Sequence, residues 1–261
     1  MKKTSLFVVL MLITVIGAGT ASFAACTATS LTTAPGVWGI ESQGSGPGGF
    51  TNYLMQVTFV SGGTFTGTRW ESVAGTISGP TTISGTWAMA TPASTCQGTM
   101  TVTTPSTQTF NFAINNTNKG GTIVQIDAGY TQAGFMVAQG TIAAGCSTAL
   151  FKNKQFSLYS YGQIPAAGGL VTGTGEIKFS STGTTFNAVP SVTLDLGAVG
   201  NFVVPANGTS AITAGCTGSG TLTVPALGQT FNVDTVVVGA GKEALWIVTN
   251  SGDNVTGYFL Q

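Results

Sequence analysis

The sequence contains no histidine, and only 6% of its 261 residues are charged. The absence of histidine excludes the Ser-His-Asp triad, the Cys-His dyad and every zinc site with a histidine ligand. The eight basic residues form no cluster, whereas a nucleic-acid-binding protein needs clustered lysine and arginine to neutralise phosphates. We therefore expect no nucleic-acid partner, no metal and no cofactor.

Glycine and hydrophobic residues are abundant instead. The chain has 38 glycines, 43% hydrophobic residues and a formal net charge of zero. Intrinsically disordered chains combine low hydrophobicity with high net charge, and this chain has neither property. The composition therefore predicts a folded, nearly neutral protein.

The amino terminus has the pattern of a secretory signal peptide. Lys2 and Lys3 precede an apolar run over residues 6–16, and small residues follow as far as Ala24. The run is shorter than the roughly 20 residues that span a bilayer. We predict that residues 1–24 are a signal peptide of bacterial type, cleaved after Ala24. The mature protein is then expected in the periplasm, at the cell surface or secreted into the extracellular medium.

The four cysteines indicate an internal repeat. Cys26 and Cys96 are 70 positions apart, Cys146 and Cys216 are also 70 apart, and the second pair follows the first by 120 positions. Four cysteines allow three pairings. A unit copied as a whole keeps its bridge within itself, so we predict the disulfides Cys26–Cys96 and Cys146–Cys216.

Other segments recur at offsets of 120 to 123 residues. Residues 108–111, Gln-Thr-Phe-Asn, recur as residues 229–232, for example. A fixed period is the signature of a duplicated structural unit. We therefore expect two copies, residues 25–144 and 145–261, each folding separately.

A lipid anchor on Cys26 is an alternative to the first disulfide. Residues 23–26, Phe-Ala-Ala-Cys, resemble the lipobox of bacterial lipoproteins. Lipidation of Cys26 would leave Cys96 unpaired in an oxidising compartment, so we favour the disulfide over membrane anchoring.

Short alternating segments bounded by glycine, proline or asparagine predict an all-β fold of about eight strands per copy. A sandwich leaves sheet edges that need protecting charges, whereas a closed barrel has no edges. With so few charges, we predict two tandem antiparallel β-barrels rather than sandwiches. The strands expected in the first copy are 36–43, 52–60, 64–71, 82–88, 98–103, 109–115, 122–127 and 134–138.

The segments after the second cysteine of each copy carry a family resemblance. Cys96-Gln97-Gly98-Thr99 and Cys216-Thr217-Gly218-Ser219 each lead into an apolar strand. They resemble a Cys-x-Gly-Thr hairpin motif of secreted, uncharacterised bacterial β-rich proteins. That resemblance implies a β-rich exported protein and no particular activity.

The most individual candidate for a binding site is Arg69-Trp70-Glu71. Arg69 is the only arginine of the chain, and the second copy has no such group. Arginine and tryptophan are enriched in binding hot spots, so an exposed pair would suit a sugar ring or an anion. The alternative is packing of Trp70 in the core with Arg69 paired to an acid. Trp38 and Tyr159 are expected at equivalent core positions of the two copies.

Three classes of function remain. The missing catalytic groups and the duplication favour a non-catalytic module, either structural or binding a glycan, a small apolar ligand or a surface protein. The first alternative is an enzyme that uses a carboxylate within a barrel cavity. The second is one outer-membrane barrel formed from both copies.

Overall fold

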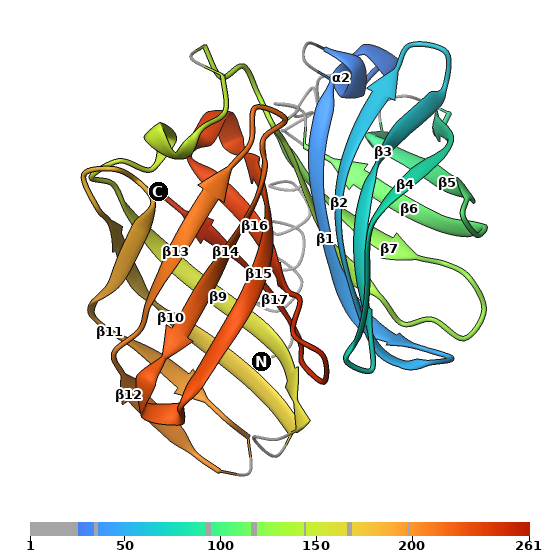
Figure 1. Ribbon diagram of the computed structural model, residues 1–261. Coiled ribbons are helices and arrows are strands. Elements are labelled where there is room, and N and C mark those ends of the chain that lie inside the picture. Colours follow the sequence, from blue (N-terminus) through green and yellow to red (C-terminus); the bar gives the residue numbers. More distant parts are fainter. Residues whose placement is uncertain are drawn as a thin grey trace, which may run out of the picture.

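The computed structural model describes residues 26–33, 36–91, 95–115, 119–143, 145–165, 169–197 and 199–261. The predicted signal peptide, residues 1–24, and residue 144 at the predicted boundary lie outside these residues. Both halves of the chain form antiparallel β-barrels, which stand side by side (Figure 1).

Eight strands close the first barrel, because each strand pairs with the next and β8 pairs back with β1. All eight strands expected in this half are present, and their ends differ from the predicted ones by at most six residues. The strands are β1 (Val37–Gly46), β2 (Gly49–Val60), β3 (Thr64–Val73), β4 (Thr76–Met89), β5 (Gln97–Thr104), β6 (Gln108–Ile114), β7 (Gly120–Gln125) and β8 (Ala133–Ala138).

The second barrel also closes with eight strands, and β10 pairs with both β9 and β11 to complete the ring. A ninth strand, β12, pairs with β11 beside the ring. It is separated from β13 by Pro205, which has no backbone N–H for a strand ladder. The strands are β9 (Gln155–Ile164), β10 (Gly169–Phe179), β11 (Thr185–Asp195), β12 (Asn201–Val204), β13 (Asn207–Ile212), β14 (Thr217–Val224), β15 (Gln229–Val238), β16 (Glu243–Val248) and β17 (Asn254–Leu260).

Alternation along the strands fills each barrel with side chains. In β6, Phe110 and Phe112 point inward and are buried, whereas Asn111 between them is exposed. The four short helices are α2 (Ala28–Thr32), η2 (Thr148–Leu150), η4 (Pro225–Leu227) and η5 (Gly239–Gly241). Of these, α2 packs on the first barrel, where Leu31 is fully buried and its carbonyl accepts a hydrogen bond from Trp38 Nε1 at 3.0 Å.

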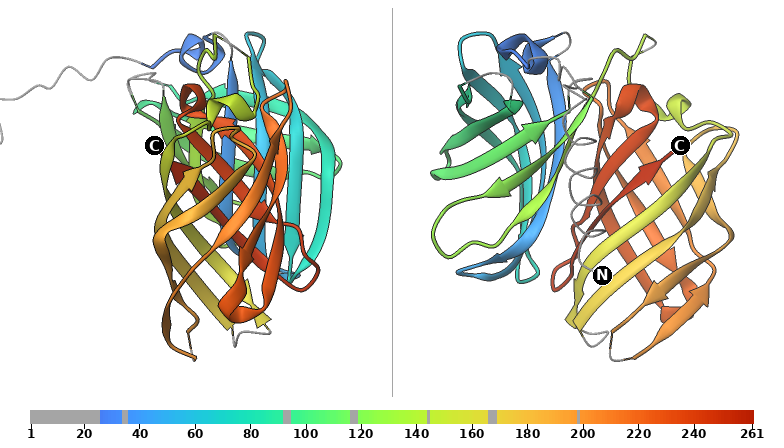
Figure 2. Two further views of the ribbon diagram at one scale, coloured as in Figure 1. Left: turned by 60° about the vertical axis from the view of Figure 1, so that its left-hand side comes forward. Right: turned by 180° about the vertical axis from the view of Figure 1, so that it is seen from behind.

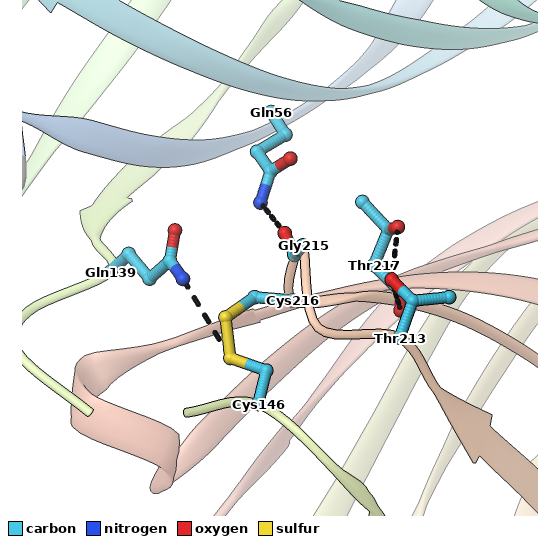
Figure 3. The surroundings of a disulfide bond; sticks show 7 residues. All are labelled: Gln56, Gln139, Cys146, Thr213, Gly215, Cys216 and Thr217. Carbon is cyan, nitrogen blue, oxygen red and sulfur yellow. Dashed lines mark hydrogen bonds between the residues drawn. A yellow bond between two sulfur atoms is a disulfide. The ribbon is translucent and has the colours of Figure 1, made fainter. Parts of the chain in front are cut away.

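Both predicted disulfides are confirmed, one in each barrel. They lie at matching places in the two barrels. Cys96 directly precedes β5 and Cys216 directly precedes β14, and both residues have positive φ values, 52° and 62°. The second disulfide is close to the first barrel (Figure 3). Gln139 Nε2 approaches Cys146 Sγ to 3.8 Å, and Gln56 Nε2 donates to the carbonyl of Gly215 at 2.8 Å.

Two expectations are corrected by this fold. One barrel assembled from both halves is wrong, because each half closes upon itself. The proposed equivalence of Trp38 and Tyr159 is also wrong. Trp38 is buried in the first barrel, whereas Tyr159 points outward and is 38% exposed; the inward aromatic residue near the start of β9 is Phe156.

The barrels share a buried interface. Strands β1 and β2 pack against β15, β16 and β17, as the views from opposite sides also show (Figure 2). Leu54 and Trp70 of the first barrel meet an apolar surface of the second, whose buried members are Val236, Val238, Leu245 and Ile247. Separate folding of the two halves stays a prediction, and an isolated half would expose this surface to water.

Close approach of the two barrels depends on Gly39. A Cβ atom at this position would lie 2.5 Å from Val238 Cγ1 and 3.1 Å from Leu245 Cδ1. We expect Gly39→Val to lower the free energy of unfolding by roughly 1–3 kcal/mol, because overpacking at this contact pushes the barrels apart. Chemical denaturation measures the loss, and Gly62→Val is the matched control because nothing lies within 4 Å of its Cβ position. Equal losses in the two variants would contradict the prediction.

Candidate functional site

The three predicted binding residues lie on opposite sides of β3. Arg69 and Glu71 point into the first barrel, as do their partners on β2, whereas Trp70 points outward to the second barrel. Arg69 is 4% exposed and Trp70 is 5% exposed. The prediction of an exposed arginine–tryptophan pair is therefore wrong, and the alternative with both residues buried holds.

Arg69 is the centre of a polar network inside the first barrel. Its Nη2 is 2.9 Å from Glu71 Oε2, and its Nη1 donates to Gln108 Oε1. Gln108 Nε2 in turn donates to the Tyr53 hydroxyl at 2.8 Å, and the guanidinium carbon lies 5.2 Å from the Tyr53 ring centroid. Burial is the main cause of the raised pKa of Tyr53, and the nearby Glu71 charge adds to it. These contacts hold strands β2, β3 and β6 together.

Trp70 belongs to the interface between the barrels. It pairs across the strands with Leu54, and its indole lies near Asp234 on β15. Burial raises the pKa of Asp234, and the interaction with Trp70 partly offsets that rise. A residue in this position joins the barrels and is not available to a ligand.

The remaining acids of the first barrel do not form a catalytic pair. Asp127 Oδ2 accepts hydrogen bonds from the Thr109 backbone N–H at 2.9 Å and from Gln125 Nε2 at 2.8 Å. Glu41 lies on the outer face of β1, buried against the second barrel. Asp127 is thus held by hydrogen bonds and Glu41 by burial, and neither carboxylate lines the interior cavities of about 20 and 40 Å³.

Two small interior cavities lie in the second barrel. One has a volume of about 40 Å³ and is lined by apolar side chains together with Ser160, and the other has a volume of about 20 Å³. Trp246 borders both of them. A water occupies roughly 10–15 Å³ and needs two or more polar partners, so these small apolar spaces are far too small for a substrate and unsuited to water.

Larger hollows lie on the outer faces of the barrels. On the first barrel, strands β5, β6 and β7 carry a depression of about 450 Å³, which we call the β5–β7 groove. The Thr99 hydroxyl donates to Asn111 Oδ1 at 3.2 Å across this surface. No charged side chain lines the groove in the described part of the chain; its outward members are Gln97, Thr99, Asn111, Ala113, Thr122 and Val124.

The second barrel has a hollow of about 700 Å³ over β13, β14 and β15, which we call the β13–β15 groove. Strands β14 and β15 match β5 and β6 of the first barrel, whereas β13 matches β4 and not β7. Asn232 pairs across the strands with Thr221, whereas the place in β15 that matches Asn111 in β6 is that of Asp234, which pairs with Ser219 as Asn111 pairs with Thr99. Thr221 and Thr209 hydroxyls are 2.9 Å apart. Asp234 lies at the margin of this groove as its one acidic lining residue in the described chain.

The sequence contains a pattern that indicates these polar outer surfaces. The alternation that predicted the strands places threonine and asparagine on the outward face of β5, β6, β14 and β15. Threonine is favoured in strands, so its abundance in the sequence alone does not indicate a binding surface.

Metal-binding clusters and membrane-spanning helices are both absent from the described residues. No three histidine, cysteine, aspartate or glutamate side chains gather there in a way that could hold a metal ion. Within the same ranges, no helix is long and apolar enough to cross a membrane. The two disulfides indicate an oxidising environment, since such bonds are rare in reducing compartments.

Comparison with known proteins assigns no family. No family model matches the chain, and no curated protein matches it. Among solved structures, a protein of unknown function from the DUF3598 family of Nostoc punctiforme is similar over 89% of this chain and 97% of that chain, with 9% identity and a TM-score of 0.21. A similarity at this level carries no argument about fold or function.

Proposed function

We propose that the protein is an exported, non-catalytic module that binds an uncharged polar surface, such as a glycan, through the β5–β7 and β13–β15 grooves. The observation that carries this proposal is that each barrel has a polar hollow on its outer face, and that the two hollows share the strand pair following the second cysteine, β5–β6 in one barrel and β14–β15 in the other. Export to the periplasm or the cell exterior is part of the proposal and is supported by the two disulfides.

The chemistry of the grooves favours such a ligand. Threonine hydroxyls and asparagine amides both donate and accept hydrogen bonds, as sugar hydroxyls do. A charged ligand would need opposite charges, which the β5–β7 groove does not offer among its described lining residues. Two weak sites on one chain would also strengthen attachment to a repeating polymer, because the second contact is intramolecular.

The filled interiors argue against the alternatives. A small apolar ligand or a substrate within a barrel would need far more room than the cavities of about 20 and 40 Å³ supply. Recognition of a surface protein by the same grooves is an outcome that the binding experiment separates from glycan recognition.

We expect Asn111→Ala and Asn232→Ala together to weaken binding to a glycan array at least tenfold, because each substitution removes an amide from the floor of one groove. Each single variant should keep part of the avidity. Asn201→Ala is the matched control, since Asn201 is exposed on β12, outside both grooves.

Unchanged binding by the double variant, with an intact melting curve, would contradict the assignment of the grooves. Absence of any glycan binding by the wild-type protein would contradict the ligand class.

A further inference from the structure

Glu41 is a buried carboxyl group at the contact between the barrels. It lies on the outer face of β1, between the cross-strand neighbours Leu54 on β2 and Phe135 on β8, and it is 4% exposed. The neighbouring β1 position on the same face, Gly39, touches Val238 and Leu245 of the second barrel. Glu41 is therefore enclosed by the two barrels together.

Among the described residues, no lysine or arginine forms an ion pair with this carboxyl group. The ion pair found there joins Arg69 and Glu71 inside the first barrel. The Glu41 carboxyl group lies near Tyr159 of β9, and Tyr159 in turn lies near Tyr161 and stacks on Tyr258 of β17. The charged residues at the ends of β16 and β17 are Lys242 and Glu243 at the start of β16 and Asp253 directly before β17. β2 and β8 present the apolar side chains of Leu54 and Phe135 to Glu41, so these strands offer no group that favours its ionised form.

The hydrogen bonds of Thr256 indicate which form is present. Thr256 is a hydrogen-bonding neighbour of the Glu41 carboxyl group. Its hydroxyl donates to the Trp246 carbonyl at 2.8 Å. A hydroxyl has one proton, so Thr256 Oγ1 can only accept a hydrogen bond from Glu41, and Glu41 must then carry the donated proton.

We propose that Glu41 is a neutral carboxylic acid that joins the two barrels through Thr256, and that its ionisation loosens their contact. This device is independent of the grooves and of the ligand proposed for them. It makes the relative placement of the two barrels, and hence of the two grooves, sensitive to the pH outside the cell.

The direction of the effect follows from the acid's titration. Burial raises the pKa of Glu41 from 4.5 to about 7, and the hydrogen bond with Thr256 offsets only part of that rise. Below pH 4.5, the carboxyl group is neutral whether the barrels are joined or apart, and the contact is strongest. Between pH 4.5 and about 7, only the separated form loses its proton, so the contact weakens about tenfold per pH unit. Above that range the contact weakens no further.

Glu41→Gln in the full chain tests the acid. Glutamine is neutral at every pH and its amide can donate to Thr256 as the carboxylic acid does. We expect the ratio of the unfolding equilibrium constants of variant and wild type to change roughly a hundredfold between pH 4.5 and pH 8. The wild type should also show a protonated-carboxyl infrared band above pH 5 that the variant lacks. Glu176→Gln, at an exposed strand position, is the matched control.

Acrylamide quenching of Trp70 tests the contact. Trp70 lies in the interface, whereas Trp38, Trp87 and Trp246 are buried in the barrel cores, so Trp70→Phe identifies its signal. Quenching should rise with pH in the wild type and stay low in Glu41→Gln. A ratio of unfolding constants constant within about threefold would overturn the proposal. The proposal would also be overturned if this ratio changed with pH while acrylamide reached Trp70 equally at both pH values in the wild type and in Glu41→Gln.

Discussion

Replacing Cys26 and Cys96 together by alanine is expected to lower the free energy of unfolding of the first barrel by roughly 4 kcal/mol. The bridge joins residues 70 positions apart. Closing a loop of that length lowers the conformational entropy of the unfolded chain and thereby stabilises the folded state. Alanine is chosen because Cys26 is only 1% exposed, so a serine hydroxyl would be buried there.

The first sign of the loss should appear in the segment that the bridge ties down. Cys26 leads into α2, whose Leu31 covers Trp38 at the end of the barrel. Hydrogen exchange should therefore quicken in residues 28–33 before it does in β6. Chemical denaturation without reductant measures the total effect, and reduction of the wild-type protein, which also breaks Cys146–Cys216, should lower the stability further. A loss below about 1 kcal/mol would show that the bridge does not stabilise the barrel.

The strands, their closure and the disulfides were within reach of sequence reasoning, for related physical reasons. A strand with one wet face has a period of two residues, and Phe110-Asn111-Phe112 displays it directly. The scarcity of charge favoured closure, because unprotected edges are a liability. The equal spacing of the cysteine pairs favoured bridges within each half, and both are formed.

The interface between the barrels was missed, although the sequence contains a signal for it. Residues 236–238 and 244–248 are continuous apolar runs, and the strands containing them are buried on both faces. Such runs are typical of strands covered on both sides, not of a barrel exposed to water. On the first barrel, the charged residue Glu41 interrupts the apolar pattern of β1, so the sequence does not indicate that the outer face of this strand is buried.

The proposed binding pair failed for a simpler reason. Neighbouring residues in a strand point to opposite faces, so Arg69 and Trp70 could never present one joint surface from β3. What local sequence cannot reveal is that both faces of this strand are covered. That depends on the partner barrel and on Gln108, 39 positions further along the chain.

Arg69→Ala is expected to lower the free energy of unfolding by about 3 kcal/mol, because it leaves Glu71 inside the first barrel without its partner. The same change removes the donor to Gln108 Oε1 and the cation over the Tyr53 ring. The Glu71 side chain is 18% exposed, so water reaches part of its charge and keeps the loss near the lower end for buried pairs.

A charge-neutral double variant separates the ion pair from the space that it fills. Arg69→Met with Glu71→Gln keeps similar volumes and leaves no unpaired charge, so it should recover most of the stability lost in Arg69→Ala. Lys178→Ala, which removes an exposed charge, is the control and should stay within about 0.5 kcal/mol of the wild type. If the double variant were as unstable as Arg69→Ala, the loss would come from packing around Tyr53. The network would then stabilise the barrel by shape, and the pairing of charges would contribute little.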